Sequence, residues 1–255
     1  MKLENEIRKA LEKKKILLMT HLVLGYPSFD VNRRVIEQMV ENGVDLIELQ
    51  IPFSEAVADG PTILKANQEA ISSGALVGKC IDFAGEITST HSIPFLFMTY
   101  FNIMFKFGWE DFMDKAGAAG IRGFIVPDLP PEEGEDYFRK AARERDMGFV
   151  QIFAPTSTKE RMRELSSRSE GFVYCVARRG VTGKKTDFDE GFNSYLSRCR
   201  QATSLPLAVG FGIRSREDVE SLSGKADIAV IGTETIRLVN EEGVDAVGPF
   251  IASLR

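Results

Sequence analysis

The chain has 255 residues, of which 44% are hydrophobic and 27% are charged, and its formal net charge is -5 at pH 7. This length suits one α/β barrel with a large buried core, and the acidic balance argues against a nucleic-acid partner. The three cysteines have no metal-ligand spacing, and neither a signal peptide nor a membrane span is recognisable, so we expect a cytoplasmic protein without a metal site.

The predicted elements alternate between short apolar runs and amphipathic segments. An amphipathic helix is expected over residues 1–14, before the first strand. Eight apolar runs are predicted as strands, at residues 16–23, 44–50, 94–100, 123–127, 149–154, 172–177, 205–210 and 227–232. Helical patterns follow at residues 31–42, 77–90, 109–119, 132–145, 159–167, 188–201 and 216–223. The runs show no strict alternation, which is typical of parallel strands buried on both faces.

Eight such units in this length favour a closed barrel over a doubly wound sheet. A doubly wound sheet usually carries a Gly-x-Gly-x-x-Gly turn after its first strand, whereas this strand leads into Leu24-Gly25-Tyr26-Pro27. We therefore predict an α/β fold, a (βα)8 TIM barrel, in which residues 1–255 form a single domain. The extra N-terminal helix is expected to cover the bottom of the barrel. The loop after the second strand is enlarged and belongs to the C-terminal end, where barrel enzymes place their sites.

The second strand carries the most informative residues. It breaks into a loop at Pro52, and two carboxylates, Glu48 and Asp59, lie on either side of the break. Alternation along the strand places Glu48 and Gln50 on the face that points into the barrel. A carboxylate there must be paired, hydrogen-bonded, protonated or functional, because burying it alone is costly. The alternative is a structural glutamate bonded to a neighbouring strand or loop.

Other residues near the predicted C-terminal end also suggest chemistry. Tyr174 on the sixth strand can reach the same cavity, or it is a core residue whose hydroxyl is bonded to a neighbour. Glycines follow the last three strands, at residues 180–183, 210–212 and 232. Glycines let backbone N–H groups approach an anion, and barrels often hold a phosphate with the loops after strands seven and eight. These turns predict a phosphate site, with ordinary tight turns as the alternative.

Five motifs, in this order, resemble the tryptophan synthase alpha subunit family. They are Glu48-Leu-x-Ile-Pro-Phe-Ser-x-x-x-Ala-Asp-Gly-Pro, Tyr100-Phe-Asn102, Val126-Pro-Asp128-Leu-Pro, Arg-x-Gly-Val-Thr-Gly and Gly-Phe-Gly-Ile. The similarity runs from about residue 20 to residue 235, and the first of these motifs is unusual among barrels. It implies retro-aldol cleavage of indole-3-glycerol phosphate to indole and glyceraldehyde 3-phosphate, without metal or organic cofactor. It also implies a beta-subunit partner in an α2β2 complex.

The same resemblance implies roles for individual residues. Glu48 would shuttle protons, Asp59 would accept the hydrogen bond of the indole nitrogen, and Tyr174 would position the substrate or relay a proton. Asn102 is a weaker candidate for ordering the loop after the second strand. Substrate contacts are implied for His21, Tyr100, Thr182 and Phe211. Phosphate contacts are implied for Gly183, Gly212, Gly232 and Thr233.

Five positions depart from the family pattern. Gln50 stands where glycine is usual, and its amide can narrow the pocket or bind the catalytic glutamate. Glu55-Ala56 replaces Asp-Pro in the loop that helps to dock the beta subunit. His21 replaces an aromatic or apolar residue, as a pocket contact or as a core histidine. Glu234 replaces a small neutral residue, and its charge would repel a phosphate unless it points outward.

Three other functions stay open at this point. The chain can be a stand-alone or diverged lyase for a related phosphorylated compound, or a catalytically weak subunit that mainly binds and activates a beta partner. A sugar-phosphate isomerase barrel would share the late phosphate loops but would not need the Glu48 and Asp59 motif. Adding a beta subunit distinguishes these functions. Indole release rises for a subunit that cleaves substrate within a complex, is unchanged for a stand-alone lyase, and stays low for a subunit that mainly binds the partner.

Overall fold

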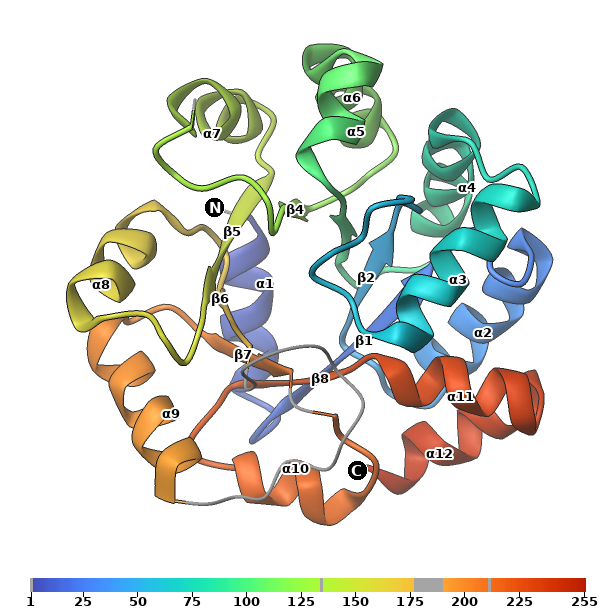
Figure 1. The fold of residues 1–255 in the computed structure, drawn as a ribbon. Helices are drawn as coiled ribbons and strands as arrows, with labels where there is room; N and C mark the ends of the chain where they lie inside the picture. Colours follow the sequence, from blue (N-terminus) through green and yellow to red (C-terminus); the bar gives the residue numbers. More distant parts are fainter. Residues whose placement is uncertain (1, 134, 177–189, 211) are drawn as a thin grey trace.

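The computed structural model describes residues 2–133, 135–176, 190–210 and 212–255. Within them, eight parallel strands form a closed barrel in chain order, and β1 closes it by pairing with both β2 and β8 (Figure 1). The predicted (βα)8 barrel is therefore confirmed. The strands are β1 (Leu17–Val23), β2 (Leu46–Gln50), β3 (Phe95–Met98), β4 (Gly123–Ile125), β5 (Gly148–Phe153), β6 (Val173–Val176), β7 (Leu207–Gly210) and β8 (Ile228–Ile231).

Helices surround this barrel, and the predicted helical segments all recur, α4 with the predicted ends and the others with shifted ends. The predicted ones are α1 (Lys2–Leu11), α2 (Phe29–Glu41), α4 (Val77–Thr90), α6 (Trp109–Ala118), α7 (Glu135–Glu144), α8 (Lys159–Arg168), α9 (Glu190–Ala202) and α10 (Arg216–Leu222). Additional helices are α3 (Pro61–Ser72), α5 (Phe101–Phe107), α11 (Thr233–Glu241), η1 (Val244–Ala246) and α12 (Val247–Ser253). No helix in the described part of the chain is long and apolar enough to cross a membrane.

The enlarged loop after β2 contains a helix that the sequence analysis did not predict. Helix α3 begins with Pro61 at its first turn, a position that proline favours because its missing N–H has no partner there in any case. Its buried side chains are mostly small and include one polar residue, Asn67. A weak apolar face of this kind gives little helical periodicity in the sequence.

The strands are buried on both faces, as predicted. All seven residues of β1 and all five of β2 are buried. Aromatic side chains fill much of the space between barrel and helices, and Phe124 lies 5.9 Å from Phe112 and 6.3 Å from Phe149 between ring centroids. Burying one such side chain contributes about 1.5–3 kcal/mol. This rigid packing fixes the strand ends that carry the candidate site.

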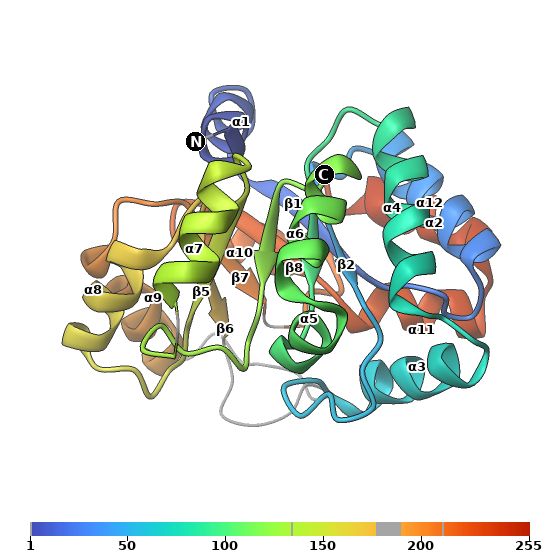
Figure 2. The ribbon, with the colours of Figure 1, turned by 90° about the horizontal axis from the view of Figure 1, so that it is seen from above.

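Helix α1 covers the bottom of the barrel, as expected. Leu3 is fully buried, and a Cβ atom added to Gly171 would lie 2.5 Å from its Cδ2 atom. Gly148, the first residue of β5, faces the same side chain. The backbone N–H of Lys2 also donates to Asp146. Figure 2 shows α1 at one end of the barrel and α3 at the other, so the enlarged loop lies at the C-terminal end of the strands.

Candidate active site

Strand register brings His21 and Glu48 together inside the barrel. The two residues are direct partners in the pairing of β1 with β2. The Nδ1 atom of His21 lies 3.0 Å from Oε1 of Glu48, and each residue is only 3% exposed. The buried carboxylate that the sequence predicted is therefore paired, and its partner is an imidazole from the neighbouring strand.

A second hydrogen-bonded group forms two residues further along β2. The side-chain amide of Gln50 donates to Oδ2 of Asp59 over 2.6 Å, and the hydroxyl of Tyr100 donates to the same oxygen over 3.4 Å. The sequence analysis considered a hydrogen bond between Gln50 and the catalytic glutamate. The structure instead shows the amide of Gln50 bound to Asp59. Residue 50 links the strand to its own loop and holds the second carboxylate over the barrel mouth.

The loop between β2 and α3 is fixed by two buried side chains. The hydroxyl oxygen of Tyr100 accepts a hydrogen bond from the backbone N–H of Ala58 over 3.1 Å. Asn67, which is fully buried on α3, accepts one from the backbone N–H of Phe53 over 2.9 Å. Asn102, the weaker candidate for this task, is exposed on α5. Sequence reasoning missed Asn67, although an asparagine among the small apolar residues of a helix is a usable signal.

Tyr174 reaches the same part of the barrel interior from β6. Gly210, at the end of β7, leaves room for this side chain. A Cβ atom added to Gly210 would lie only 3.0 Å from the hydroxyl oxygen of Tyr174. Burial raises the pKa of Tyr174 well above 10, and the charges of Glu48 and Asp59 act in the same direction. Tyr174 therefore stays a neutral phenol, able to donate a hydrogen bond, near both carboxylates.

The surroundings shift the titration of His21 and Asp59. Burial lowers the pKa of His21, but the hydrogen bond and charge of Glu48, together with the charge of Asp59, outweigh it, so this pKa is raised above 6.5. Burial also raises the pKa of Asp59 above 3.8, against the opposing effects of Gln50, His21 and Tyr100. Clustered, shifted groups of this kind are typical of sites that transfer protons.

The predicted phosphate site lies at the ends of β7 and β8. Gly212 has a φ of 84°, which glycine adopts without strain. Gly232 precedes α11, and Thr233 is the first residue of that helix. The N–H groups of a first helical turn have no intrahelical partner and attract anions. Three other predicted contacts, Thr182, Gly183 and Phe211, lie outside the described residues.

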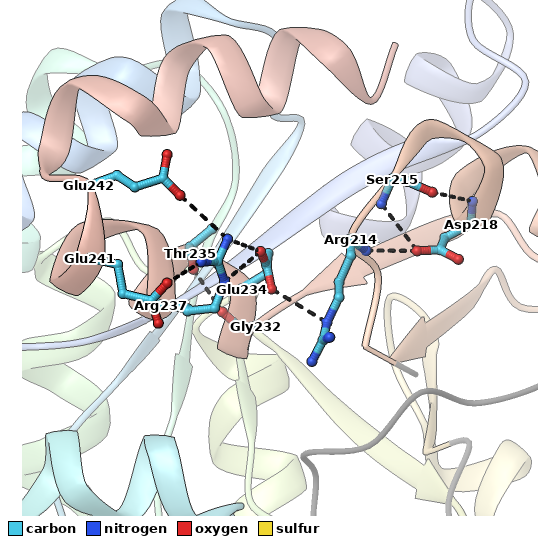
Figure 3. A network of polar contacts seen from close by, with 9 residues as sticks. All are labelled: Arg214, Ser215, Asp218, Gly232, Glu234, Thr235, Arg237, Glu241 and Glu242. Carbon is cyan, nitrogen blue, oxygen red and sulfur yellow. Dashed lines mark hydrogen bonds and ion pairs between the residues drawn. The ribbon is translucent and has the colours of Figure 1, made fainter.

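The charge of Glu234 is balanced by two arginines (Figure 3). The Nη2 and Nε atoms of Arg237 donate to its Oε1 atom over 2.6 and 2.8 Å. From the loop after β7, the Nε atom of Arg214 lies 3.5 Å from Oε2. The carboxylate is mostly buried among these cations. The repulsion that the sequence suggested for a bound phosphate is therefore offset.

Fold and site together define a class of protein. The two buried carboxylates, the neutral phenol and the first turn of α11 all lie at the C-terminal end of a (βα)8 barrel, where barrel enzymes carry out catalysis. Within the described residues, no group of three or more His, Cys, Asp or Glu side chains is arranged to hold a metal ion. The chain thus has the architecture of a barrel enzyme, with ionisable side chains gathered at the end of the barrel where such enzymes carry their sites.

Comparison with known proteins identifies the family. A model of the tryptophan synthase alpha chain family matches residues 7–247. The tryptophan synthase alpha chain of Desulfotalea psychrophila is 63% identical over the full length of both chains, and that of Desulforapulum autotrophicum is 57% identical over 99% of each. A structure of Mycobacterium tuberculosis tryptophan synthase superimposes with a TM-score of 0.91 at 28% identity, covering 99% of this chain and 96% of that one. The chain belongs to the tryptophan synthase alpha chain family.

Proposed function

We propose that Glu48, Asp59 and Tyr174 carry out the cleavage of indole-3-glycerol phosphate to indole and glyceraldehyde 3-phosphate. This retro-aldol reaction is the work of the alpha subunit in tryptophan biosynthesis, and it makes the family one of carbon–carbon lyases. The observation that carries the assignment of residues is the position of two buried carboxylates from β2 and its loop beside a protonated tyrosine.

The proposed roles follow from what the bond cleavage requires. A proton must reach C3 of the indole ring, and another must leave the hydroxyl group next to the bond that breaks. Glu48 does both, because its buried side chain lies inside the barrel, next to Nδ1 of His21. Asp59 accepts the indole N–H and stabilises the positive charge that develops there. Tyr174 donates a hydrogen bond and orients the substrate.

Substrate binding is assigned to residues on both sides of these three. The indole contacts would come from His21, Tyr100, Thr182 and Phe211. The phosphate would bind backbone N–H groups of Gly183, Gly212, Gly232 and Thr233. In support, Gly212 and the first turn of α11 lie at the end of the barrel that commonly holds phosphates, and the neighbouring carboxylate of Glu234 is paired with two arginines.

Arg214 should contribute to substrate affinity because it balances Glu234 beside this phosphate site. Replacing it with alanine leaves more negative charge near the phosphate and should raise KM roughly two- to five-fold, the size expected for a partly exposed ion pair. Steady-state kinetics with indole-3-glycerol phosphate measures this change. The double variant Arg214→Ala/Glu234→Ala should bring KM back towards the wild-type value.

The matched control is Arg216→Ala. Arg216 lies two residues away and pairs with Glu220 on the surface of α10, so its loss should leave KM unchanged. An equal rise of KM in both single variants would point to a general loss of positive charge and would contradict a specific role for Arg214.

The family works with a beta subunit in an α2β2 complex. The loop after β2 and helix α5 offer two exposed apolar side chains, Val57 at 81% and Phe105 at 65% exposure. Tyr100 connects these segments, because it precedes α5 and binds the loop backbone at Ala58. We assign this surface to the beta subunit.

Serine at both Val57 and Phe105 should weaken binding to the beta subunit about tenfold, because exposed apolar anchors commonly supply a large share of interface energy. Calorimetric titration of the beta subunit measures the effect. Tyr137→Ser is the control, since Tyr137 is 73% exposed on α7, outside this surface. Equal affinities for the double variant and the wild type would place the interface elsewhere.

The decisive test of the proposed function is indole release from indole-3-glycerol phosphate by the purified chain, with and without a beta subunit. Release that rises when the beta subunit is added supports a lyase that acts within the complex. Indole release that does not change when the beta subunit is added would support a stand-alone lyase. Complex formation without indole release would indicate a subunit that only binds its partner.

The organisation and location of the chain belong to the same proposal. We infer a single barrel domain over residues 1–255 and a cytoplasmic location. The three cysteines are free thiols and all are buried, which suits a reducing compartment.

A further inference from the structure

The contact between His21 and Glu48 joins an ionisable side chain to the carboxylate that is proposed to shuttle protons. Both side chains are almost completely buried, and their polar atoms are 3.0 Å apart. The other nitrogen of His21, Nε2, is buried and has no hydrogen-bond partner among the described residues. A core histidine kept only for packing would normally have both nitrogens satisfied, because an unpaired buried polar atom is destabilising.

The groups that face this pair come from several elements. From β2 and its loop come Glu48 itself and Asp59, whose charge acts on His21. From β6 comes Tyr174, which interacts with the charges of both carboxylates. From the segment after β3 comes Tyr100, whose hydroxyl is directed at Asp59. His21 therefore interacts with the charges of two carboxylates, and each of these carboxylates lies near a neutral phenol.

Strand β8 and helix α11 add no free charge to this environment. Gly232 lies against the Cβ atom of His21, and the hydroxyl of Thr235 donates to the backbone carbonyl of His21. The carboxylate of Glu234 is engaged by arginines. The charge balance around His21 is therefore set by the carboxylates of β2 and its loop.

We propose that His21 is the proton partner of Glu48, and that the two side chains hold one exchangeable proton between them during the lyase reaction. This inference rests on the proposed function. It makes His21 a positioning residue that acts through Glu48, in addition to any contact that its ring makes with the indole.

The proton balance of the reaction closes with this pair. At the start, the pair holds one more proton than a neutral imidazole beside an ionised carboxylate would hold. Glu48 passes that proton to C3 of the indole ring, and His21 is left neutral beside an ionised carboxylate. The hydroxyl proton of the substrate then moves to Glu48 as the C–C bond breaks, and the bonding electrons return to the indole ring. The pair ends with the one proton with which it began, and no other reactant is needed.

The first arm of the test is a titration of His21 by nuclear magnetic resonance of the imidazole nitrogens. The chain has only two histidines, His21 and His91, so the variant His91→Gln leaves one imidazole signal. We expect the midpoint for His21 to lie above 6.5, and to fall by roughly one pH unit or more in Glu48→Gln, because an opposite charge at this distance shifts a pKa by one to three units. A midpoint that Glu48→Gln does not change would overturn the pairing.

The second arm is the pH dependence of kcat in two variants of His21. Asparagine can keep a donor near the position of Nδ1, but it cannot titrate, whereas phenylalanine offers neither property. Both variants should move the alkaline limb of the profile to lower pH, because an imidazole keeps its proton to higher pH than a carboxyl group does. At pH 8 we expect a loss of about tenfold in kcat for His21→Asn, with little change in KM.

Each outcome of the second arm decides one statement. A wild-type pH profile in His21→Asn would reduce His21 to a hydrogen-bond donor and overturn its role as proton partner. A higher KM with an unchanged kcat profile in both variants would limit it to substrate contact. Absence of indole release by the wild type would overturn the proposed function and the role of His21 in it, while the titration would still decide whether the pair shares a proton.

Discussion

Replacing Glu48 with glutamine should lower the rate of indole release roughly 10²- to 10⁴-fold, the usual contribution of a general acid–base group. Glutamine has nearly the same shape, so it can still accept a hydrogen bond from Nδ1 of His21. It can neither give nor take the reacting proton. We therefore expect a loss in kcat and little change in KM, measured by the appearance of indole under saturating substrate.

Binding of the beta subunit serves as the control for this variant, because it reports whether the mouth of the barrel is still correctly folded. Glu48→Gln should still bind the beta subunit with wild-type affinity, because the exposed side chains of Val57 and Phe105 lie outside the barrel interior. A variant that binds the partner normally and cleaves at more than a tenth of the wild-type rate would remove Glu48 from the reaction. A variant that fails in both assays would show only that the fold is damaged.

Asparagine at Asp59 should lower kcat roughly 10²- to 10³-fold, as expected when a group that stabilises developing charge is lost. The carboxylate is buried and held by Gln50 and Tyr100, so its charge is directed at one place with little screening by water. Because burial raises the pKa of Asp59 above 3.8, its ionised form is lost as the pH falls through that raised value. The wild-type profile should therefore show an acid limb to which Asp59 contributes.

Two further variants separate the charge of Asp59 from its position. Tyr100→Phe removes the 3.4 Å hydrogen bond to Asp59 and the 3.1 Å bond from the backbone N–H of Ala58, but it leaves the 2.6 Å bond of Gln50, so we expect less than a tenfold loss. Gln50→Gly removes the shorter bond and should cost more than Tyr100→Phe does. If Asp59→Asn kept wild-type kcat, the charge of residue 59 would have no role in cleavage.

The strands and the inward direction of Glu48 could be predicted because they depend on local patterns. Apolar runs of strand length recur along the whole chain, and alternation along β2 is enough to place Glu48 on the inner face. The partner of Glu48 could not be predicted in the same way. The pairing of His21 with Glu48 depends on the register of β1 against β2, which single-strand patterns do not specify.

The contacts of Gln50 and Glu234 also divide into those that the sequence can predict and those that require the fold. Gln50 binds Asp59 only because the loop returns over the barrel, and that return depends on Tyr100 and Asn67 from other segments. The pairing of Glu234 with Arg237 is an i,i+3 contact, visible in the sequence once the helix is recognised. Its contact with Arg214 joins the loop after β7 to the first turn of α11, so it could be found only from the fold.

Helix α1 has a consequence for the order in which the chain assembles during synthesis. It is translated before the barrel strands, yet the hydrogen bond from the backbone N–H of Lys2 to Asp146 spans 144 residues. The glycines that receive Leu3, Gly148 and Gly171, are also made much later. The apolar side chain of Leu3 therefore has no packing partner at this end of the barrel until more than half of the chain has been translated. Helix α1 is made before the strands that it covers, and it can dock only after β5 and the turn before β6 exist.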